Sequence, residues 1–246
     1  MTQPGTGAAK AARHTREDVV VAALGILDQY GLADLTMRRL GAVLDVQPSA
    51  LYWHFANKQT LLASIADRIV ERARFVPQTD DAFAAASVTG GQWRGATRDE
   101  AYALRDALLA FRDGAELVSS TLALGLGAGL PITRLTASIR RGGFDRRTSG
   151  IAAAAIVHFV LGHVSHEQQR LQADSLGVVA EAASAHPASA HPASAHPASA
   201  HPTSAHPTTA GSVPQAIESF EFGISLLVAG LDVQHRQASQ PTTKPV

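Results

Sequence analysis

Four large side chains in succession, Tyr52-Trp53-His54-Phe55, are the most distinctive chemical feature of this chain. Neighbours on a helix point about 100° apart, so the four cannot all face a core. Leu51 and Phe55 have the spacing of a buried side, which turns the other side chains outward. Their amide, hydroxyl, imidazole and aromatic groups suit the base edges and phosphates of DNA. This outward set is Gln47, Ser49, Ala50, Tyr52, Trp53 and His54.

Two short helices must hold these side chains in place. Thr36 has the side chain of an N-cap for a helix over residues 36–44, and the chain then breaks at Asp45-Val46. Pro48 suits the first position of a second helix, because that position needs no backbone N–H. The first helix has an inner face of Met37, Leu40 and Leu44. Helices joined this tightly predict a helix-turn-helix, and the alternative is a small bundle whose aromatic cluster is core.

A third helix precedes this pair and completes a three-helix head. Thr15-Arg16-Glu17-Asp18 has the pattern of a capping box, and the helix is expected to end near Tyr30-Gly31. Its apolar stripe is Val20, Ala23, Leu24 and Leu27. Lys58, which follows the helix pair, suits a phosphate contact. Residues 1–14 lack the apolar core of a signal peptide, so we expect them to form a flexible arm.

The head motif Leu51-Tyr52-Trp53-His54-Phe55-x-Asn57-Lys58, preceded by Leu35-Thr36-x-Arg38-x-Leu40, is more specific than a bare helix-turn-helix pattern. It resembles the DNA-binding domain of the tetracycline-repressor (TetR) family. The resemblance implies that Arg38 reads a base, while Thr36 and Lys58 contact the DNA backbone. Pro48 lies one place earlier than the proline of the tetracycline repressors proper, and Ala50 replaces a threonine beside it, so the resemblance does not imply their operator sequence. The implied recognition-helix contacts are Gln47, Pro48, Ser49, Tyr52, Trp53 and His54.

The resemblance continues through the rest of the chain, where it is specific to the tetracycline-repressor branch. The matching segments are Phe111-Arg112-Asp113-Gly114-Ala115, Gly143-Phe144, His158-Phe159-Val160-Leu161-Gly162 and Phe222 to Leu231. The implied fold is all-α, with an N-terminal three-helix helix-turn-helix head and a helical ligand-binding and dimerisation domain, in an Ω-shaped homodimer. The implied function is a cytoplasmic repressor that a small-molecule inducer releases from a palindromic operator DNA.

Hydrophobic periodicity divides the chain into two domains. We expect the DNA-binding domain with its linking helix at 15–75 and the ligand-binding and dimerisation domain at 76–235, followed by a flexible tail at 236–246. No alternating strand pattern competes with the helices in the second domain. Those helices are expected at 97–112, 116–124, 131–141 and 145–172.

The last helix carries an apolar seam that indicates a dimer interface. Its residues are spaced by three and four, as in a helix bundle, and pairing with the 145–172 helix of a second copy would make a four-helix interface. The same spacing also fits a seam that packs only within its own chain. The seam consists of Ile217, Phe220, Ile224, Leu227 and Leu231.

The ligand of the second domain is expected to be largely apolar. By the resemblance, Val118, Thr121 and His166 occupy positions that help to hold a magnesium-chelated drug, but only the threonine is retained. Losing an imidazole and a carboxylate together disfavours a magnesium-chelated ligand, and we expect no cofactor. Glu100 is the expected polar anchor of the pocket. The candidate pocket residues are Glu100, Leu104, Leu108, Phe111, Val118, Thr121, Leu122, His158, Val160, Leu161 and His166.

A competing hypothesis is a metal-binding or enzymatic helical protein that uses His158, His163, His166 and Glu167. Residues one turn apart on a helix can converge on one ion. His158 and His163 could equally be structural, and His166 with Glu167 is expected to be a solvated or interface pair. The chain has no cysteine, no phosphate-binding Gly-Lys-Ser/Thr loop and no His-Glu-x-x-His pair, so this hypothesis is the weaker one.

A repeat of Ser-Ala-His-Pro-x occurs five times over residues 184–208 and predicts a disordered linker, because proline at every fifth position forbids a continuous helix. Its histidines could alternatively chelate a metal. The chain has 21 basic and 21 acidic residues, so any attraction to DNA must arise from local charge. No apolar run is expected to be long enough to span a bilayer, since His158 and His163 interrupt the one at 151–164.

Overall fold

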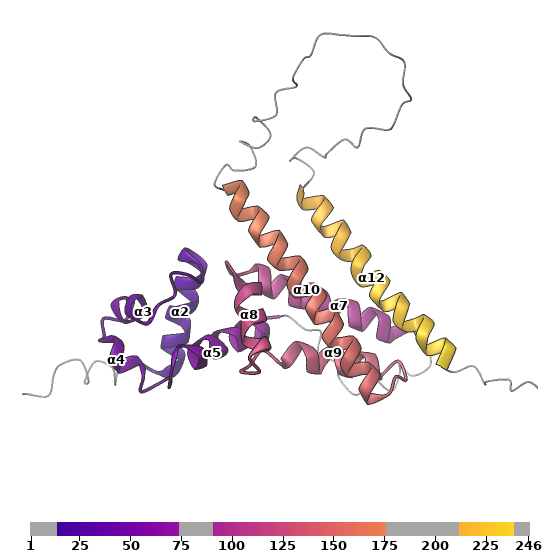
Figure 1. The fold of residues 1–246 in the computed structure, drawn as a ribbon, viewed down its shortest axis with the longest axis horizontal. Coiled ribbons are helices and arrows are strands. Elements are labelled where there is room, and N and C mark those ends of the chain that lie inside the picture. The colour runs from indigo at the N-terminus through magenta and orange to yellow at the C-terminus, as the bar shows by residue number, and fades with distance from the viewer. Residues whose placement is uncertain (1–13, 74–90, 176–211, 239–246) are drawn as a thin grey trace, which may run out of the picture.

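The computed structural model describes residues 14–73, 91–175 and 212–238, and every regular element in these ranges is an α-helix, as the sequence predicted. The helices form a head and a larger body that α5 joins (Figure 1). The predicted arm and the repeat at 184–208 lie outside the described residues. The helices are α2 (Arg16–Tyr30), α3 (Met37–Val43), α4 (Pro48–Leu51), α5 (Lys58–Glu71), α7 (Gln92–Leu109), α8 (Gly114–Ala123), α9 (Leu130–Arg140), α10 (Arg146–Ser175) and α12 (Ser212–Ala238).

The head consists of α2, α3, α4 and the first part of α5 around a small apolar core. Thr15 Oγ1 accepts the Asp18 N–H at 3.1 Å, and the Asp18 carboxylate accepts the Thr15 N–H at 2.7 Å, which confirms the predicted capping box. Asn57 and Thr60 cap α5 in the same reciprocal way. Each cap satisfies backbone donors that would otherwise lack a partner. The largest buried side chains are Leu27, Leu35, Leu40, Leu51, Phe55, Leu61 and Ile65.

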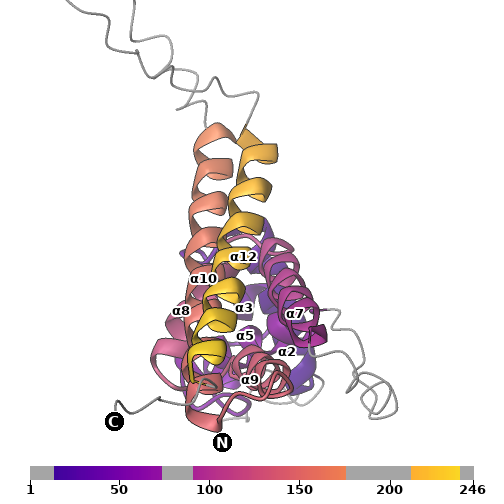
Figure 2. The ribbon, with the colours of Figure 1, turned by 90° about the vertical axis from the view of Figure 1, so that its right-hand side faces the viewer.

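The body is built around α10, its longest helix. α7, α8 and α9 pack against α10, and α12 lies alongside it (Figures 1 and 2). Burying a Leu, Val or Phe side chain fully contributes about 1.5–3 kcal/mol, so the residues between these helices hold the body together. They include Leu104, Leu108, Leu117, Leu135, Ile156, Val160, Phe220 and Ile224.

Two buried polar side chains of α10 fix its position on α7. Glu167 accepts two hydrogen bonds from Arg105 at 2.8 and 2.9 Å, and the two side chains are only 11% and 10% exposed. Gln168 donates to the carbonyl oxygens of Leu108 at 3.0 Å and Phe111 at 2.8 Å. These directional contacts set the register of α10 against α7, which apolar packing alone does not specify.

The head and the body meet at two aspartates. Asp113, in the turn between α7 and α8, accepts the backbone N–H of Leu32 at 2.8 Å with one oxygen and the Gln172 amide at 2.5 Å with the other. Gly31 has φ +85°, and a Cβ there would lie 2.7 Å from the Asp113 carboxylate. Asp67 of α5 accepts the Ala128 N–H at 2.6 Å. The orientation of the head is thus tied to the loops on either side of α8.

Two sequence expectations about the long helices were wrong. α10 is long and apolar enough, by length and composition, to cross a membrane, although we expected no such segment. His158 and His163 do not lower the mean hydropathy of α10 below that of a membrane-spanning helix. The buried side of α10 is nevertheless covered by α7, α8 and α9, as in the core helix of a globular protein. α12 continues to Ala238, so the expected tail at 236–246 begins too early.

Candidate nucleic-acid interface and ligand-binding interior

The turn between α3 and α4 is as tight as the sequence predicted. The Val46 N–H donates to the Gly41 carbonyl at 2.9 Å, and Asp45 adopts φ +53°, a left-handed conformation that reverses the chain. A Cβ on Gly41 would lie 2.8 Å from the Val46 carbonyl oxygen and 3.3 Å from the Pro48 nitrogen. Only glycine therefore lets α3 and the start of α4 approach so closely, and this fixes the angle at which α4 is presented.

α4 exposes most of the side chains that the sequence assigned to DNA. Its regular part ends at Leu51, but the Phe55 N–H still donates to the Leu51 carbonyl at 3.1 Å, so residues 52–54 continue as a helical turn. Leu51 and Phe55 are buried, whereas Trp53 is 86% and Tyr52 51% exposed. The bundle alternative is wrong for these two rings. Gln47 and Ser49 are also exposed, Pro48 and His54 are half-buried, and only Ala50 of the expected outward set is buried.

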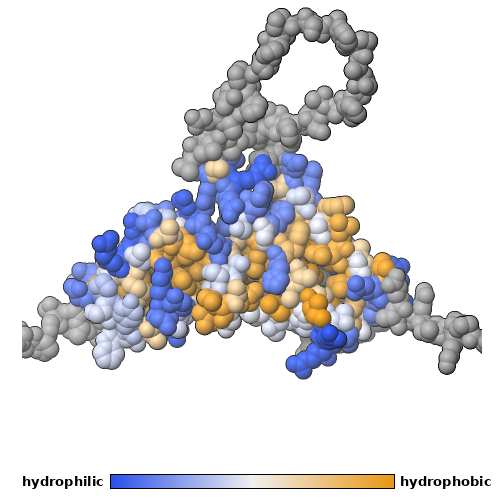
Figure 3. All heavy atoms as spheres, in the orientation of Figure 1, coloured by the Kyte–Doolittle hydropathy of each residue, from blue (hydrophilic) through white to orange (hydrophobic). Residues whose placement is uncertain are grey.

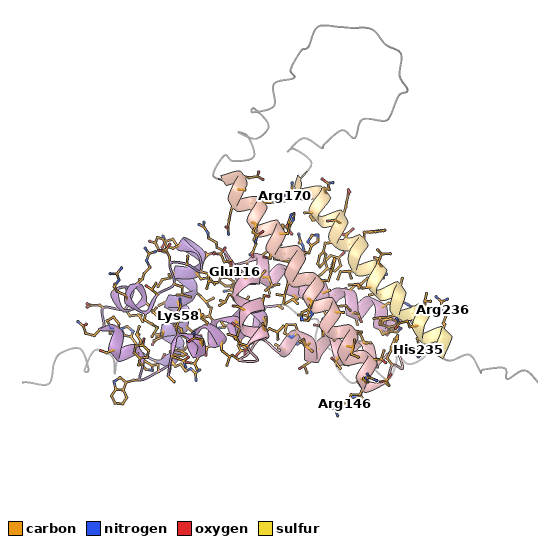
Figure 4. The ribbon with its side chains drawn as sticks, viewed as in Figure 1. Lys58, Glu116, Arg146, Arg170, His235 and Arg236 are labelled. Carbon is orange, nitrogen blue, oxygen red and sulfur yellow. The ribbon has the colours of Figure 1, made fainter. Side chains whose placement is uncertain are left out.

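Thr36, Arg38 and Lys58 lie at the starts of α3 and α5. Thr36 caps α3 by accepting the Arg39 N–H at 3.1 Å, which leaves its hydroxyl proton for another acceptor. Arg39 pairs with Asp34 at 3.1 Å and lies over the Tyr30 ring, whereas Arg38 is exposed and has no ion pair within the described ranges. Lys58 is the first residue of α5 (Figure 4). Arg38 and Lys58 are therefore both able to meet an anion.

The interior of the body contains most of the predicted ligand residues. Leu104, Leu108, Phe111, Val118, Thr121, Val160 and Leu161 are buried and Leu122 is half-buried. Glu100 is only 5% exposed, and burial raises the pKa of its carboxyl although Arg134 donates to it at 3.1 Å. The nearby Thr97 hydroxyl is buried without a partner among the described residues. The Glu100 carboxyl and the Thr97 and Thr121 hydroxyls thus lie in an interior whose other predicted ligand residues are apolar.

His158 and His166 lie outside this interior, on the exposed side of α10. Within a single chain they cannot contact a ligand held among the buried residues. A hollow of about 340 Å³ lies between α8 and α10 close to Leu161. It is lined by Glu116 (Figure 4), Ser119, Ser120, Ala123, Leu161, Gly162 and Ser165.

The histidines and Glu167 do not form the cluster that a metal site or an enzyme would need. His166 is exposed, but Glu167 is only 11% exposed and is engaged by Arg105, so Glu167 is not solvated as the sequence suggested. His163 lies 2.9 Å from the Ser219 hydroxyl and against the Phe159 and Phe220 rings, and its burial lowers the pKa of its imidazole. Within the described ranges, no three or more His, Asp and Glu side chains are grouped to hold a metal.

The apolar seam of α12 packs partly within its own chain, which corrects the predicted interface. Phe220 and Ile224 are completely buried against α7 and α10, so a second copy cannot contact them, whereas Ile217 is exposed. Leu227 and Leu231 are half-buried. Of the seam, only Ile217 belongs to the large apolar side chains that α10 and α12 leave exposed, which are Ile151, Leu171, Ile217, Phe222, Leu226 and Val233.

Sequence reasoning assigned no role to the residues that connect the head to the body. Asp113 stood within the matched Arg-Asp-Gly-Ala segment, and aspartate before glycine is a recognised turn signal. Nothing in the sequence pairs Asp113 with Leu32, or Arg105 with Glu167, because these partners are distant along the chain. Such contacts become visible only when the helices are packed.

Comparison with known proteins agrees with this geometry. The family described as "Tetracyclin repressor-like, C-terminal domain" matches residues 87–235, and "Bacterial regulatory proteins, tetR family" matches residues 19–65. The Escherichia coli tetracycline repressor protein class C is 35% identical over 165 residues, which cover 65% of this chain and 68% of that protein.

Solved structures show the same arrangement of helices. BioQ from Mycobacterium smegmatis matches with a TM-score of 0.65 and 37% identity, over 89% of this chain and 97% of that one. A BioQ chain crystallised with its double-stranded DNA operator matches with a TM-score of 0.56 and 40% identity, over 70% of this chain and 99% of that one. This chain therefore belongs to the TetR family of bacterial transcription regulators, with a helix-turn-helix head and a tetracycline-repressor-like C-terminal domain.

Proposed function

We propose that this protein is a homodimeric repressor that leaves its operator when a small, largely apolar ligand binds in the body. The observation that carries the proposal is the surface of α4: Tyr52 and Trp53 point outward from a turn that buried Leu51 and Phe55 anchor. A rigid exposed face of this size on so short a helix fits the major groove, which admits one helix. The proposed contacts are Thr36, Arg38, Gln47, Pro48, Ser49, Tyr52, Trp53, His54 and Lys58.

Dimerisation through α10 and α12 is supported by the apolar surface that they expose. Phe222 is 66% and Leu226 56% exposed, and hydrophobic side chains gather over α12 (Figure 3). Large apolar patches on a soluble protein usually mark an interface. A two-fold axis beside α10 and α12 would bring two such faces together and set the two heads apart. We propose that Ile217, Leu227 and Leu231 lie at the margin of this interface.

The ligand site is proposed to lie among the buried residues of α7, α8 and α10. Its apolar walls favour an apolar ligand, and Glu100 with Thr97 and Thr121 would orient one polar group of that ligand. Burial raises the Glu100 pKa and so favours the neutral carboxyl, which can both donate a hydrogen bond to a polar group of the ligand and accept one from it. The hollow beside Leu161 is the proposed approach from solvent.

Asp113 provides a physical route from this site to the head. It lies in the turn that joins α7 to α8, accepts from Leu32 in the head and holds Gln172 of α10. A ligand that displaces α7 or α8 would move Asp113 and so change the spacing between the two heads. By linkage, ligand binding must weaken operator binding by the same factor by which the operator weakens ligand binding.

The proposal is tested by footprinting the protein on the DNA that flanks its coding region. A dimer in successive major grooves should protect two half-sites whose centres are roughly 34–36 Å apart, arranged as an inverted repeat. If the protein protected the whole DNA fragment evenly, and if nonspecific competitor DNA abolished that protection, the result would contradict an operator-specific repressor. Disappearance of the footprint on adding a ligand, with the dimer intact, would identify the inducer.

A further inference from the structure

The turn between α9 and α10 carries a basic cluster that the proposed function does not use. Arg140, Arg146 and Arg147 are exposed and make no ion pair among the residues that the structure describes. The carboxylate of the neighbouring Asp145 is engaged elsewhere, because it accepts from the Arg147 N–H at 2.8 Å, the Thr148 N–H at 3.0 Å and the Thr148 hydroxyl. Three guanidinium groups are therefore presented to solvent together.

Helix stability does not account for this placement. Arg146 and Arg147 lie in the first turn of α10, where the unpaired N–H groups carry partial positive charge and acidic residues are preferred. The Asp145 carboxylate complements that charge by accepting two of these N–H groups, but the two arginines beside it oppose it. Lys58 at the start of α5 is placed in the same unfavourable way, and it is a proposed phosphate contact. One Asp145 carboxylate does not balance three arginines, and an external anion would offset the remaining positive charge.

The start of α10, with Arg146, lies on the same side of the molecule as α4 (Figures 1 and 4). In Figure 1, α4 lies at the left and the beginning of α10 toward the right of the lower edge, and Figure 4 places Arg146 at that edge. Figure 2 shows α9 at the same lower end, seen from the side that α12 occupies. A second copy bound to the exposed face of α10 and α12 would bring both clusters between the two heads.

We infer that Arg140, Arg146 and Arg147 form a second DNA-binding surface, which contacts the phosphates of the operator segment between the two half-sites. The inference rests on the proposed operator-binding dimer. Duplex DNA carries one negative charge for about every 1.7 Å of its axis, so DNA that spans the two heads presents phosphates along this whole edge. One guanidinium group can donate two parallel hydrogen bonds to a phosphate group. Such contacts strengthen DNA binding without reading the base sequence.

Single substitutions at the two ends of α10 give a matched test. Arg146→Gln removes a charge from the cluster, and Arg170→Gln removes one from the exposed surface at the opposite end of the same helix (Figure 4). The measurement is the slope of the logarithm of operator affinity against the logarithm of salt concentration. The magnitude of this slope should fall by about 0.9 for each phosphate that the protein no longer neutralises. Arg146→Gln should therefore lower the slope of the dimer by about 1.8, while Arg170→Gln leaves it unchanged.

The combined variant R140Q/R146Q/R147Q locates the contact. Its affinity should fall by at least tenfold at about 0.15 M salt on the natural duplex, with helix content and dimer mass unchanged. On a duplex whose central phosphates are replaced by neutral methylphosphonates, the wild type and the variant should bind alike.

Each outcome of this experiment decides between the second surface and the repressor itself. If the wild type binds its operator through Arg38 and the triple variant binds equally well, the second surface is wrong while the repressor stands. If the variant loses the same factor on both duplexes, its arginines act elsewhere, for example on an acidic protein, and the inference again fails. A wild type that binds no DNA overturns both.

Discussion

At the scale of single residues, we propose that Arg38 of the head reads a base whereas Lys58 holds only the DNA backbone. Arg38 is exposed beside α4 and has no ion pair within the described ranges, whereas its neighbour Arg39 is held by Asp34 and Tyr30. Lys58 extends from the start of α5, beyond the recognition turn. Arg38 and Lys58 are therefore expected to contribute to binding in different ways.

Replacing Arg38 or Lys58 by alanine should reveal this difference. Arg38→Ala should lose about 1–3 kcal/mol of discrimination between operator and mismatched DNA, because bidentate base contacts carry sequence information. Lys58→Ala should weaken binding to every DNA sequence by the same factor. It should also lower the slope of log affinity against log salt by about 0.9 for each phosphate that loses its lysine contact. Gel-shift titrations of both variants on operator and scrambled duplexes at several salt concentrations measure both quantities. Identical behaviour of the two variants would contradict the assignment.

Glu100 should make stability depend on pH in the acid range. Burial raises its pKa in the folded protein above 4.5, so the unfolded carboxyl loses its proton first as the pH rises. The free energy of unfolding should therefore fall as the pH rises through 4.5 and up to the folded pKa. Urea unfolding at a series of pH values should show a shallower fall for Glu100→Gln than for the wild type. Equal slopes would show that Glu100 is not desolvated.

At the scale of helices, α10 has a different partner on each side. It holds α7 through Arg105 and Glu167, packs on α12 around Phe220, and exposes His158 and His166. A buried ion pair with two hydrogen bonds fixes a register, because neither charge can be left alone in the interior. α10 can therefore carry a movement at Gln172 to the turn that holds Asp113.

Breaking the Arg105–Glu167 pair on one side should destabilise the body strongly. Glu167→Leu leaves a buried guanidinium group without its partner, and we expect a loss of about 3–5 kcal/mol in the free energy of unfolding. The double variant R105M/E167L removes both charges and should recover most of that loss. Chemical unfolding at constant pH measures both. A double variant as unstable as the single one would mean that packing, not charge, dominates at this site.

The sequence was a good guide wherever a signal is local. Thr15, Thr36 and Pro48 marked helix starts within a residue of the observed ones, because caps and proline act through neighbouring backbone groups. It misassigned Phe220 and Ile224, since seams within a chain and between chains share one spacing. It also could not tell that His158 and His166 face outward, because helical periodicity does not say which side a neighbouring helix covers.

At the scale of the whole molecule, the body exposes an apolar face on the side away from the head. Phe222 and Leu226 are exposed on α12, and Ile151 and His158, two turns apart on α10, are exposed as well. Two heads can reach successive major grooves only if this face, or an equivalent one, joins two chains. Binding to a two-half-site operator therefore requires the dimer, so a protein that does not dimerise should not protect both half-sites.

Charges on α12 should separate the dimer without unfolding the chain. F222E/L226E places two carboxylates on the proposed interface, and like charges facing each other across the two-fold axis should yield a monomer. Leu124→Glu is the matched control, because Leu124 is equally exposed but follows α8. Sedimentation equilibrium measures the mass, and circular dichroism checks the helix content. A dimer that persists in F222E/L226E would place the interface elsewhere.

The central claim is that this chain is an operator-specific regulator, and a gel-shift titration on the DNA flanking its coding region tests it most directly. Salt and excess nonspecific competitor are held fixed, and Arg38→Ala is run beside the wild type. An operator-specific regulator should form a discrete complex of one dimer for each site, which Arg38→Ala weakens and scrambled DNA does not form. A folded, dimeric protein that shows no discrete shift, or that shifts scrambled DNA equally well, would contradict it.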